Sequence, residues 1–171
     1  VWWVSRNRIA RLNSDGSLDT SFNPNINNSV YDIEVQSDGK ILIGWNFTTV
    51  WWVSRNRIAR LNSDGSLDTW FDPNVRTSWS IVYDIEVQSD WKIILWWTFQ
   101  RISSSNTLRN RIARVNSDGS LDTWFNPNSS STIYSLTIQS DWKILVWWAF
   151  WSIWGQSRNR IARLNTNWTA D

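Results

Sequence analysis

Apolar and polar residues alternate along short stretches of the chain, and the alternation has a period of two. The even-numbered positions of Val30–Gln36, which include Asp32 and Glu34, fall on one face, and the odd-numbered positions, which include Tyr31 and Ile33, fall on the other. Because successive side chains of a strand point to opposite sides of a sheet, this pattern predicts a half-buried strand. No stretch has the 3.6-residue period of an amphipathic helix.

Turn residues divide the chain into several such stretches. Asp38-Gly39 is a two-residue hairpin signal, and Asp15-Gly16 marks a second turn. Asn23-Pro24 ends a stretch, because proline has no N–H to donate to a strand ladder. We therefore expect four strands in each unit, over Val30–Gln36, Lys40–Phe47, Arg55–Asn62 and Leu67–Phe71.

This unit is repeated along the chain almost without change. The segment Arg6–Thr20 recurs identically as Arg55–Thr69, returns as Arg109–Thr123 with Val115 in place of leucine, and begins again at Arg158. The second arginines of these segments are 49, 54 and 49 residues apart. The strand pair recurs as well, over Val30–Ile43, Val82–Leu95 and Ile133–Val146.

Four short strands in a repeating unit of about 50 residues are typical of a β-propeller blade. We therefore predict an all-β fold, a β-propeller segment of about three and a half four-stranded antiparallel blades. The partial propeller covers residues 1–171, divided into the end of a blade (1–28), a blade (29–79), a second blade (80–131) and an incomplete blade (132–171). Propellers usually close with about four to eight blades. We therefore expect ring closure through further blades of a parent chain or through self-association.

Composition excludes several classes of function. The chain has no Cys, which excludes a disulfide framework and a thiolate site, and no His, which removes the commonest general base and metal ligand. The 17 basic and 15 acidic residues are interspersed, unlike the one-sided charge of a nucleic-acid binder. No apolar run approaches the ~18 residues of a membrane span. The absence of Met favours a piece of a longer protein, so the absence of a signal peptide says nothing about its location.

Two sequence motifs follow each other in every unit. They read R-N-R-I-A-R-L-N-x-D-G-S-L-D-T-x-F and Y-x-I-x-V-Q-x-D-G-K-I-L-x-G-x-x-F. Over nearly the whole chain they resemble the bacterial delta-sixty repeat, a β-propeller-like repeat family of unknown function. The resemblance implies a propeller blade of large, secreted or surface-attached bacterial proteins, and it implies no activity, cofactor or catalytic residue.

Tryptophan stands at several positions where glycine is expected. The chain has 17 Trp and only 6 Gly. Glycine is used in turns because it adopts positive φ without steric cost, whereas a residue with a side chain there loses about 1–2 kcal/mol. The copies exchange the two residues at matched positions: Gly39 with Trp91 and Trp142, Gly16, Gly65 and Gly119 with Trp168, Gly44 with Trp96 and Trp147, and Trp51-Trp52 with Trp154-Gly155.

One hypothesis explains both the tryptophan excess and the glycine deficit. Some bacterial lineages read UGA as glycine, whereas other genetic codes read it as tryptophan. Glycines encoded by GGN would survive a translation with the wrong table, which would produce the mixed columns. We therefore expect UGA codons at Trp91, Trp142 and Trp168, and indoles that are exposed or crowded rather than packed.

A repeated motif with oxygen-bearing side chains at alternate positions is the strongest candidate for a functional site, because such a motif could bind calcium. We refer to it as the oxygen-rich motif. Calcium loops place oxygen ligands at alternate positions, but hairpin turns use the same residue types to bind the backbone. No bidentate Glu follows at the spacing of an EF-hand. We interpret the motif as a turn, with weak calcium binding as the alternative. Its members are Asn13, Asp15, Ser17 and Asp19, with copies in Asn62–Asp68 and Asn116–Asp122.

The arginines Arg6, Arg8 and Arg11 form a second candidate. They suggest contact with a polyanion, but each blade also offers acids such as Asp32 and Glu34. We therefore favour pairing between strands or between blades. The core between blades is expected to hold Tyr31, Tyr83 and Tyr134 with Ile33, Ile85 and Leu136, while Asn23–Asn28, Ser103–Ser105 and Ser129–Ser131 are solvated connectors.

These observations lead to a functional hypothesis without a catalytic residue, cofactor or metal. The acidic residues stand mostly at identical repeat positions, whereas an active site needs one asymmetric constellation. We predict a non-catalytic scaffold or interaction module of a larger bacterial secreted or cell-surface protein, with a protein or glycan partner. The alternatives are a carbohydrate-binding module that uses the tryptophans, and the propeller part of a hydrolase or lyase whose active site lies elsewhere.

Overall fold

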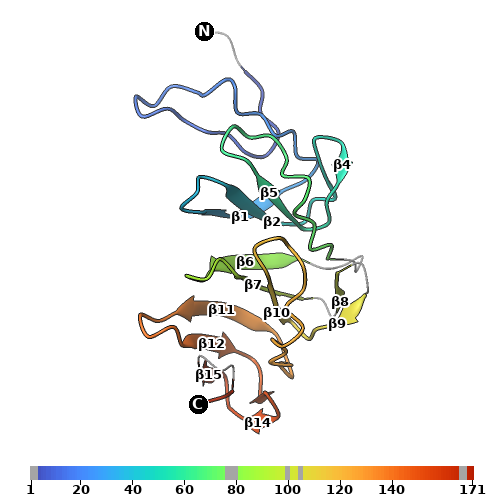
Figure 1. Ribbon diagram of the computed structural model, residues 1–171, viewed down its shortest axis with the longest axis vertical. Coiled ribbons are helices and arrows are strands. Elements are labelled where there is room, and N and C mark those ends of the chain that lie inside the picture. The colour runs from blue at the N-terminus through green and yellow to red at the C-terminus, as the bar shows by residue number, and fades with distance from the viewer. Residues whose placement is uncertain (1–3, 76–80, 99–100, 104–105, 166–168) are drawn as a thin grey trace.

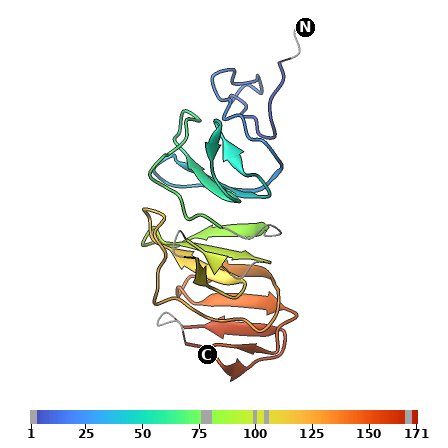
Figure 2. The ribbon, with the colours of Figure 1, turned by 90° about the vertical axis from the view of Figure 1, so that its right-hand side faces the viewer.

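The structure is a computed structural model that describes residues 4–75, 81–98, 101–103, 106–165 and 169–171. Within these residues all the regular elements are β-strands, as the period-two pattern predicts. Three-stranded sheets follow one another along the longest axis, and the two ends of the chain lie at opposite ends of this stack (Figures 1 and 2). The all-β class and the architecture of a partial propeller are confirmed.

Each three-stranded antiparallel sheet takes its strands from one blade. The first blade contains β1 (Val30–Val35), β2 (Ile41–Trp45) and β5 (Ile58–Leu61), with β2 in the middle. The second contains β6 (Val82–Val87), β7 (Ile93–Trp97) and β10 (Ile112–Val115). The third contains β11 (Ile133–Ile138), β12 (Ile144–Trp148) and β15 (Ile161–Leu164).

A short hairpin that the sequence pattern did not indicate leaves each sheet between its second and third strands. Strands of two residues have no alternation to detect, so the sequence shows only a connector there. The hairpins are β3–β4 (Thr49–Val50 and Val53–Ser54), β8–β9 (Arg101–Ile102 and Thr107–Leu108) and β13–β14 (Ser152–Ile153 and Gln156–Ser157).

The fourth segment of each blade pairs through a single bridge rather than along a strand. In the first blade this bridge joins Leu61 and Leu67. The Asp68 side chain then accepts a hydrogen bond from the N–H of Trp70 at 3.2 Å, which turns the chain away from the sheet. As a result Phe71 enters the core between two blades, where it is fully buried.

A β-bulge in the first strand of each blade changes which residues face the core. The pairing of β6 with β7 shifts between Val82 and Asp84, so Tyr83 is an extra residue on its strand. Val82 and Ile85 therefore point to the same side, where both are buried against the first blade. Similar shifts occur in β1 and β11.

The bulge explains why two of the three tyrosines are wrong members of the expected inter-blade core; the third, Tyr83, is half-buried and packs against the core between the second and third blades. Tyr31 is 71% exposed and Tyr134 is 60% exposed, whereas Ile85 and Leu136 are buried as expected. Ile33 was expected in the same core but is 47% exposed, because the described residues before β1 form no sheet that could cover it. Tyr31 stacks on Trp45 with ring centroids 4.4 Å apart. A strict alternation places tyrosine beside isoleucine, and one inserted residue removes it from that face.

The apolar core lies between consecutive blades. Leu42 and Ile58 of the first blade meet Ile85 and Leu95 of the second, and Phe71 closes the same cluster. All are buried. The equivalent phenylalanines Phe22 and Phe125 lie in the neighbouring clusters, so each unit supplies one ring to the core of the blade that follows it.

Replacing this ring tests the packing between blades. Phe71→Ala is expected to reduce the free energy of unfolding by about 3–5 kcal/mol, because it removes a buried ring and leaves a cavity. Trp70→Ala is the matched control, since Trp70 directly precedes Phe71 and is 90% exposed, and it should change stability by no more than about 0.5 kcal/mol. Urea unfolding followed by circular dichroism measures both; equal effects would contradict the assignment.

Candidate functional site

A cluster of lysine, aspartate and arginine lies at the edge of the first blade. Asp68 accepts hydrogen bonds from Lys40 Nζ at 2.8 Å and from Arg60 Nε at 2.9 Å. The Arg60 guanidinium lies over the ring of Phe71, 4.4 Å from its centroid. It also donates to the carbonyl of Ser117 in the second blade at 2.6 Å. This Lys-Asp-Arg cluster therefore ties two strands of one blade to the next blade.

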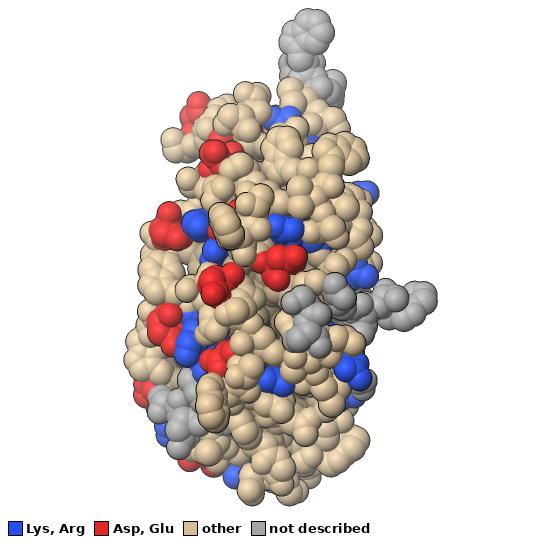
Figure 3. All heavy atoms as spheres, turned by 45° about the vertical axis from the view of Figure 1, so that its right-hand side comes forward, with Lys and Arg blue, Asp and Glu red and all other residues tan. Residues whose placement is uncertain are grey.

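The same arrangement recurs along the molecule, where basic and acidic side chains lie side by side (Figure 3). In the second blade Asp122 lies 2.7 Å from Arg114 and 3.4 Å from Lys92. The further copies are Arg11 with Asp19, and Lys143 and Arg163 with Asp171.

The structure shows which groups the arginines Arg6, Arg8 and Arg11 contact. Arg11 pairs with Asp19 at 2.7 Å, so the expected pairing within the fold is found, but with a different acid from Asp32 or Glu34. Arg6 donates to the carbonyl of Thr20 at 2.9 Å. Arg8 is exposed and has a φ of 72°. Two of the three arginines are therefore engaged by their own unit.

Burial and charge act in opposite directions on Asp68. Burial alone would raise the pKa of its carboxyl, but the hydrogen bonds and charges of Lys40 and Arg60 outweigh burial and hold the pKa below its ordinary value of 3.8. The same balance lowers the pKa of Asp122 beside Arg114. The clusters therefore hold ionised aspartates at neutral pH, with no acid or base poised for proton transfer.

The oxygen-rich motif folds as a turn that uses its own side chains. Asp15 Oδ1 accepts from the hydroxyl of Ser17 at 2.6 Å and from its N–H at 2.9 Å, and Asn13 Nδ2 donates to Ser17 Oγ at 2.9 Å. The bonds from Ser17 lower the pKa of Asp15. Asp19 points instead to Arg11. This geometry supports the turn interpretation, and in the described part of the chain no three His, Cys, Asp or Glu side chains group as metal ligands would.

A second group of acids lies between the first strands of two neighbouring blades, β1 and β6. The N–H of Ile85 donates to Asp32 Oδ2 at 2.7 Å and to Asp84 Oδ1 at 2.9 Å. Burial, together with the charge and hydrogen bond of Asp32, raises the pKa of Asp84 to about 7. Burial also raises the pKa of Glu34 and of Glu86, and their acidic neighbours add to it.

This set of acidic side chains is a feature that the sequence did not predict. The acids repeat at the same positions in two copies, but only the stacking of blades brings β1 against β6. The signal in the sequence is a difference between copies, because Ser135 and Thr137 take these positions in the third blade.

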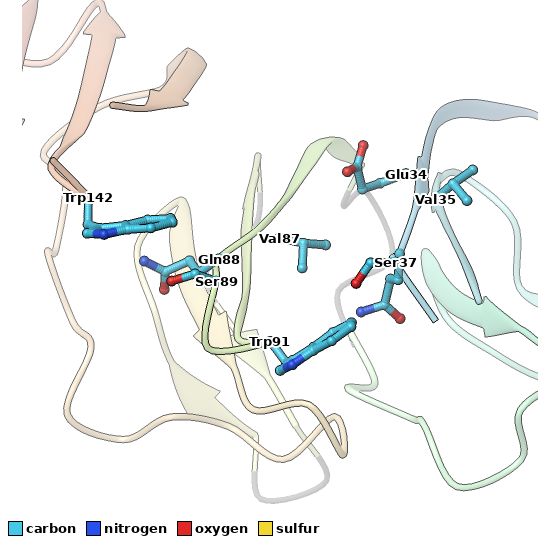
Figure 4. Close-up of a pocket in the computed structure, with 9 residues that line it drawn as sticks. Glu34, Val35, Ser37, Val87, Gln88, Ser89, Trp91 and Trp142 are labelled. Carbon is cyan, nitrogen blue, oxygen red and sulfur yellow. The ribbon is translucent and has the colours of Figure 1, made fainter. Parts of the chain in front are cut away.

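A groove of about 320 Å³ lies beside the turns that join the first two strands of each blade. Figure 4 shows the ring of Trp91 extending toward Ser37 of the first blade, and the ring of Trp142 beside Gln88 and Ser89 of the second. Glu34 lies at one end of the groove. Indole faces with polar groups between them are an arrangement on which a sugar ring can stack.

Comparison with known proteins gives one family. A family model described as "Domain of unknown function (DUF5122) beta-propeller" matches residues 2–22, 36–71, 98–125 and 139–171. No curated protein matches the chain. Among the described residues there is also no helix with the length and apolar character to cross a membrane.

Removing the central carboxylate tests the Lys-Asp-Arg cluster. Asp68→Asn is expected to lower the free energy of unfolding by about 3 kcal/mol, because Arg60 stays buried without its anion. Asp19→Asn is the matched control in a copy whose arginine is more exposed, and it should cost clearly less than Asp68→Asn, because water screens the exposed pair. Urea unfolding at pH 7 compares the two variants with the parent chain.

The loss of stability in Asp68→Asn is expected to depend on pH. Since folding lowers the pKa of Asp68, its contribution is present above the ordinary value of 3.8 and is lost as the pH falls below it. The difference between the parent chain and Asp68→Asn should therefore shrink below about pH 4. A difference that grows on acidification would contradict the cluster.

Proposed function

The chain belongs to the DUF5122 beta-propeller family, and we propose that it is a non-catalytic propeller module, a scaffold or interaction surface of a larger bacterial secreted or cell-surface protein. The observation that carries this proposal is the repetition of the Lys-Asp-Arg cluster, which places charged groups at equivalent positions in successive blades. Arg11 and Arg60 of these clusters also donate to backbone carbonyls of the following unit. An enzyme needs one asymmetric set of reactive groups. The finer assignment to delta-sixty repeats, and the secreted context with it, rests on the repeated motifs.

The hairpins are the surface that we propose for a partner. β4, β8, β9 and β14 lie toward the same side of the stack in Figure 1. Their sequences differ between copies, from TVWWVS in the first blade to SIWGQS in the third, while the sheets hardly change. Constant sheets that carry variable loops are how many binding scaffolds are built.

A substrate panel tests the non-catalytic assignment. The purified chain is incubated with chromogenic glycosides, esters and phosphates, and with acidic polysaccharides whose cleavage by a lyase yields an absorbing product. We expect the same rates as with heat-denatured chain, because no described group is poised for general acid or base catalysis outside the paired carboxyls of β1 and β6. Turnover by the folded chain alone would overturn the proposal.

The groove of Figure 4 favours carbohydrate binding as a second candidate function. Its two indoles would stack on sugar rings, and Glu34 and Gln88 would bind hydroxyl groups. This candidate depends on Trp91 and Trp142 being tryptophan in the native protein.

We propose, however, that most of the tryptophans are glycine in the native protein. Trp91 and Trp142 have φ angles of 63° and 64°, in the turn where Gly39 has 82°. In the hairpins Trp52 has a φ of 64° where Gly155 has 68°. A side chain in this left-handed region costs about 1–2 kcal/mol, whereas glycine adopts it freely.

The environment of the indoles supports the same proposal. Trp70 and Trp124 are almost completely exposed, although such rings normally bury a large area. Among the described indoles Trp96 differs, because it is fully buried and its Nε1 donates to the carbonyl of Tyr134 at 3.1 Å, while Trp45 and Trp154 are half-buried. At the matched position in the first blade, a Cβ on Gly44 would lie 3.0 Å from Ile85 Cδ1, closer than ordinary contact.

Single glycine variants separate backbone strain from loss of packing. Trp91→Gly is expected to raise the free energy of unfolding by about 1 kcal/mol, because it relieves a positive φ. Trp124→Gly is the control, since that residue is 86% exposed and its φ is not positive, and it should be neutral or destabilising by up to about 1 kcal/mol. If both variants destabilise equally, the turn does not demand glycine.

The gene and the native protein give an independent check. UGA codons at Trp91, Trp142 and Trp168, with glycine in the masses of the native peptides, are the expected result. UGG codons at these positions would contradict the proposal. A glycan array probed with the tryptophan and glycine forms then decides between the two candidate functions: binding by the tryptophan form alone, together with UGG codons, favours the groove.

A further inference from the structure

The inference concerns a hydrogen bond that crosses from the first blade to the second. Asp32 of β1 reaches the N–H of Ile85 in β6 at 2.7 Å, and Asp84 accepts from the same N–H at 2.9 Å. Because both carboxyls accept from one N–H, they lie next to each other. Two neighbouring carboxyls repel each other when both are ionised, so the pair favours a state in which one of them holds a proton.

Among the described residues, the strands packed around this pair supply no cation to replace that proton. The other titratable groups on the two strands are Glu34 and Tyr31 on β1 and Glu86 and Tyr83 on β6. Of the other strands packed against β6, β2 and β7 contain no titratable residue and β11 contains only Tyr134. The four carboxyls therefore face one another across the interface between blades, and their mutual repulsion grows with each proton lost.

The next interface down the stack is built differently. In β11 the positions of Asp84 and Glu86 are taken by Ser135 and Thr137. The second and third blades therefore meet through one acidic strand and one neutral strand, and no carboxyl pair forms between them. The chain thus contains its own comparison for the acidic interface.

We propose that Asp32 and Asp84 form a proton-linked clasp, which holds the first blade against the second in acid and loosens that interface as the pH rises through neutrality. In the protonated clasp one carboxyl donates to the other while both accept the N–H of Ile85. Loss of the proton leaves two negative charges on the same N–H. The clasp involves no tryptophan position, so it goes beyond the proposed function and does not depend on it.

The sign of the pH effect follows from the direction of the shift. Burial, then the charge of Asp32, raises the pKa of Asp84 from 3.8 to about 7. Between these two values the unfolded chain loses a proton that the folded chain keeps. The stabilising contribution is therefore fully present below about pH 4 and is lost progressively until about pH 7.

Melting temperature against pH tests the clasp. Between pH 5 and pH 8.5 the parent chain is expected to lose about 2–4 °C for each kcal/mol of clasp stability. Asp84→Asn imitates the protonated carboxyl in shape and hydrogen bonding, so it should melt higher than the parent chain at pH 8.5 and show a flatter profile. Asp84→Ser introduces the residue that the third blade has at the matched position, and it should also flatten the profile. It tests the clasp even if the asparagine variant does not fold.

Asp141→Asn is the control, since it removes an exposed carboxylate from a turn of the third blade and should leave the parent profile unchanged. Carbon-13 spectra give a direct readout: the Asp84 carboxyl should titrate near neutrality in the parent chain. It should titrate at a lower pH once Asp32→Asn removes the neighbouring charge, although burial still holds its pKa above the ordinary value. A flat parent profile, an unchanged slope in Asp84→Asn, or an Asp84 carboxyl that titrates below pH 5 would overturn the clasp.

Discussion

Each sheet of this chain has apolar side chains on both faces, and only neighbouring blades can cover them. Leu42 and Ile58 face the second blade, while Ile41 and Ile43 on the other side pack with Phe22. Ile161 is the counterpart of Ile58 in the third blade, and it is 61% exposed where Ile58 is fully buried. The comparison isolates the effect of the neighbour, because residue and strand are the same. Burial of apolar area between blades is therefore the interaction on which the rest of the fold depends.

The charged groups follow from this stacking. Once Phe71 is drawn into the core, the segment before it must leave the sheet, and Asp68 comes to lie between Lys40 and Arg60. Stacking also brings the Ser117 carbonyl within reach of Arg60. Charge is thus used to fix how one blade sits on the next, which is why the same cluster returns in each copy.

Sequence reasoning predicted the parts of the fold that depend on a single strand or turn. The strands around Ile33 and Ile43 were found because alternation and the Asp-Gly turn are local signals. The bulge at Tyr83 was not, because a bulge exists only relative to the partner strand. The carboxyls of Asp32 and Asp84 were missed for the same reason, since they lie in different units until the blades stack.

Differences between copies carry the information that repetition hides, and they are of two physical kinds. The exchange of Asp84 for Ser135 and the differences in hairpin length alter charge or reach outside the turn residues that have a positive φ. The exchange of Gly39 for Trp91 falls where the backbone has a positive φ in both copies, so the local conformation demands one residue type and the sequence supplies another. Selection for a new surface would choose the first kind of position. The second kind is therefore poor evidence for an aromatic binding surface, and the partner is better sought at the hairpins and along the acidic strands.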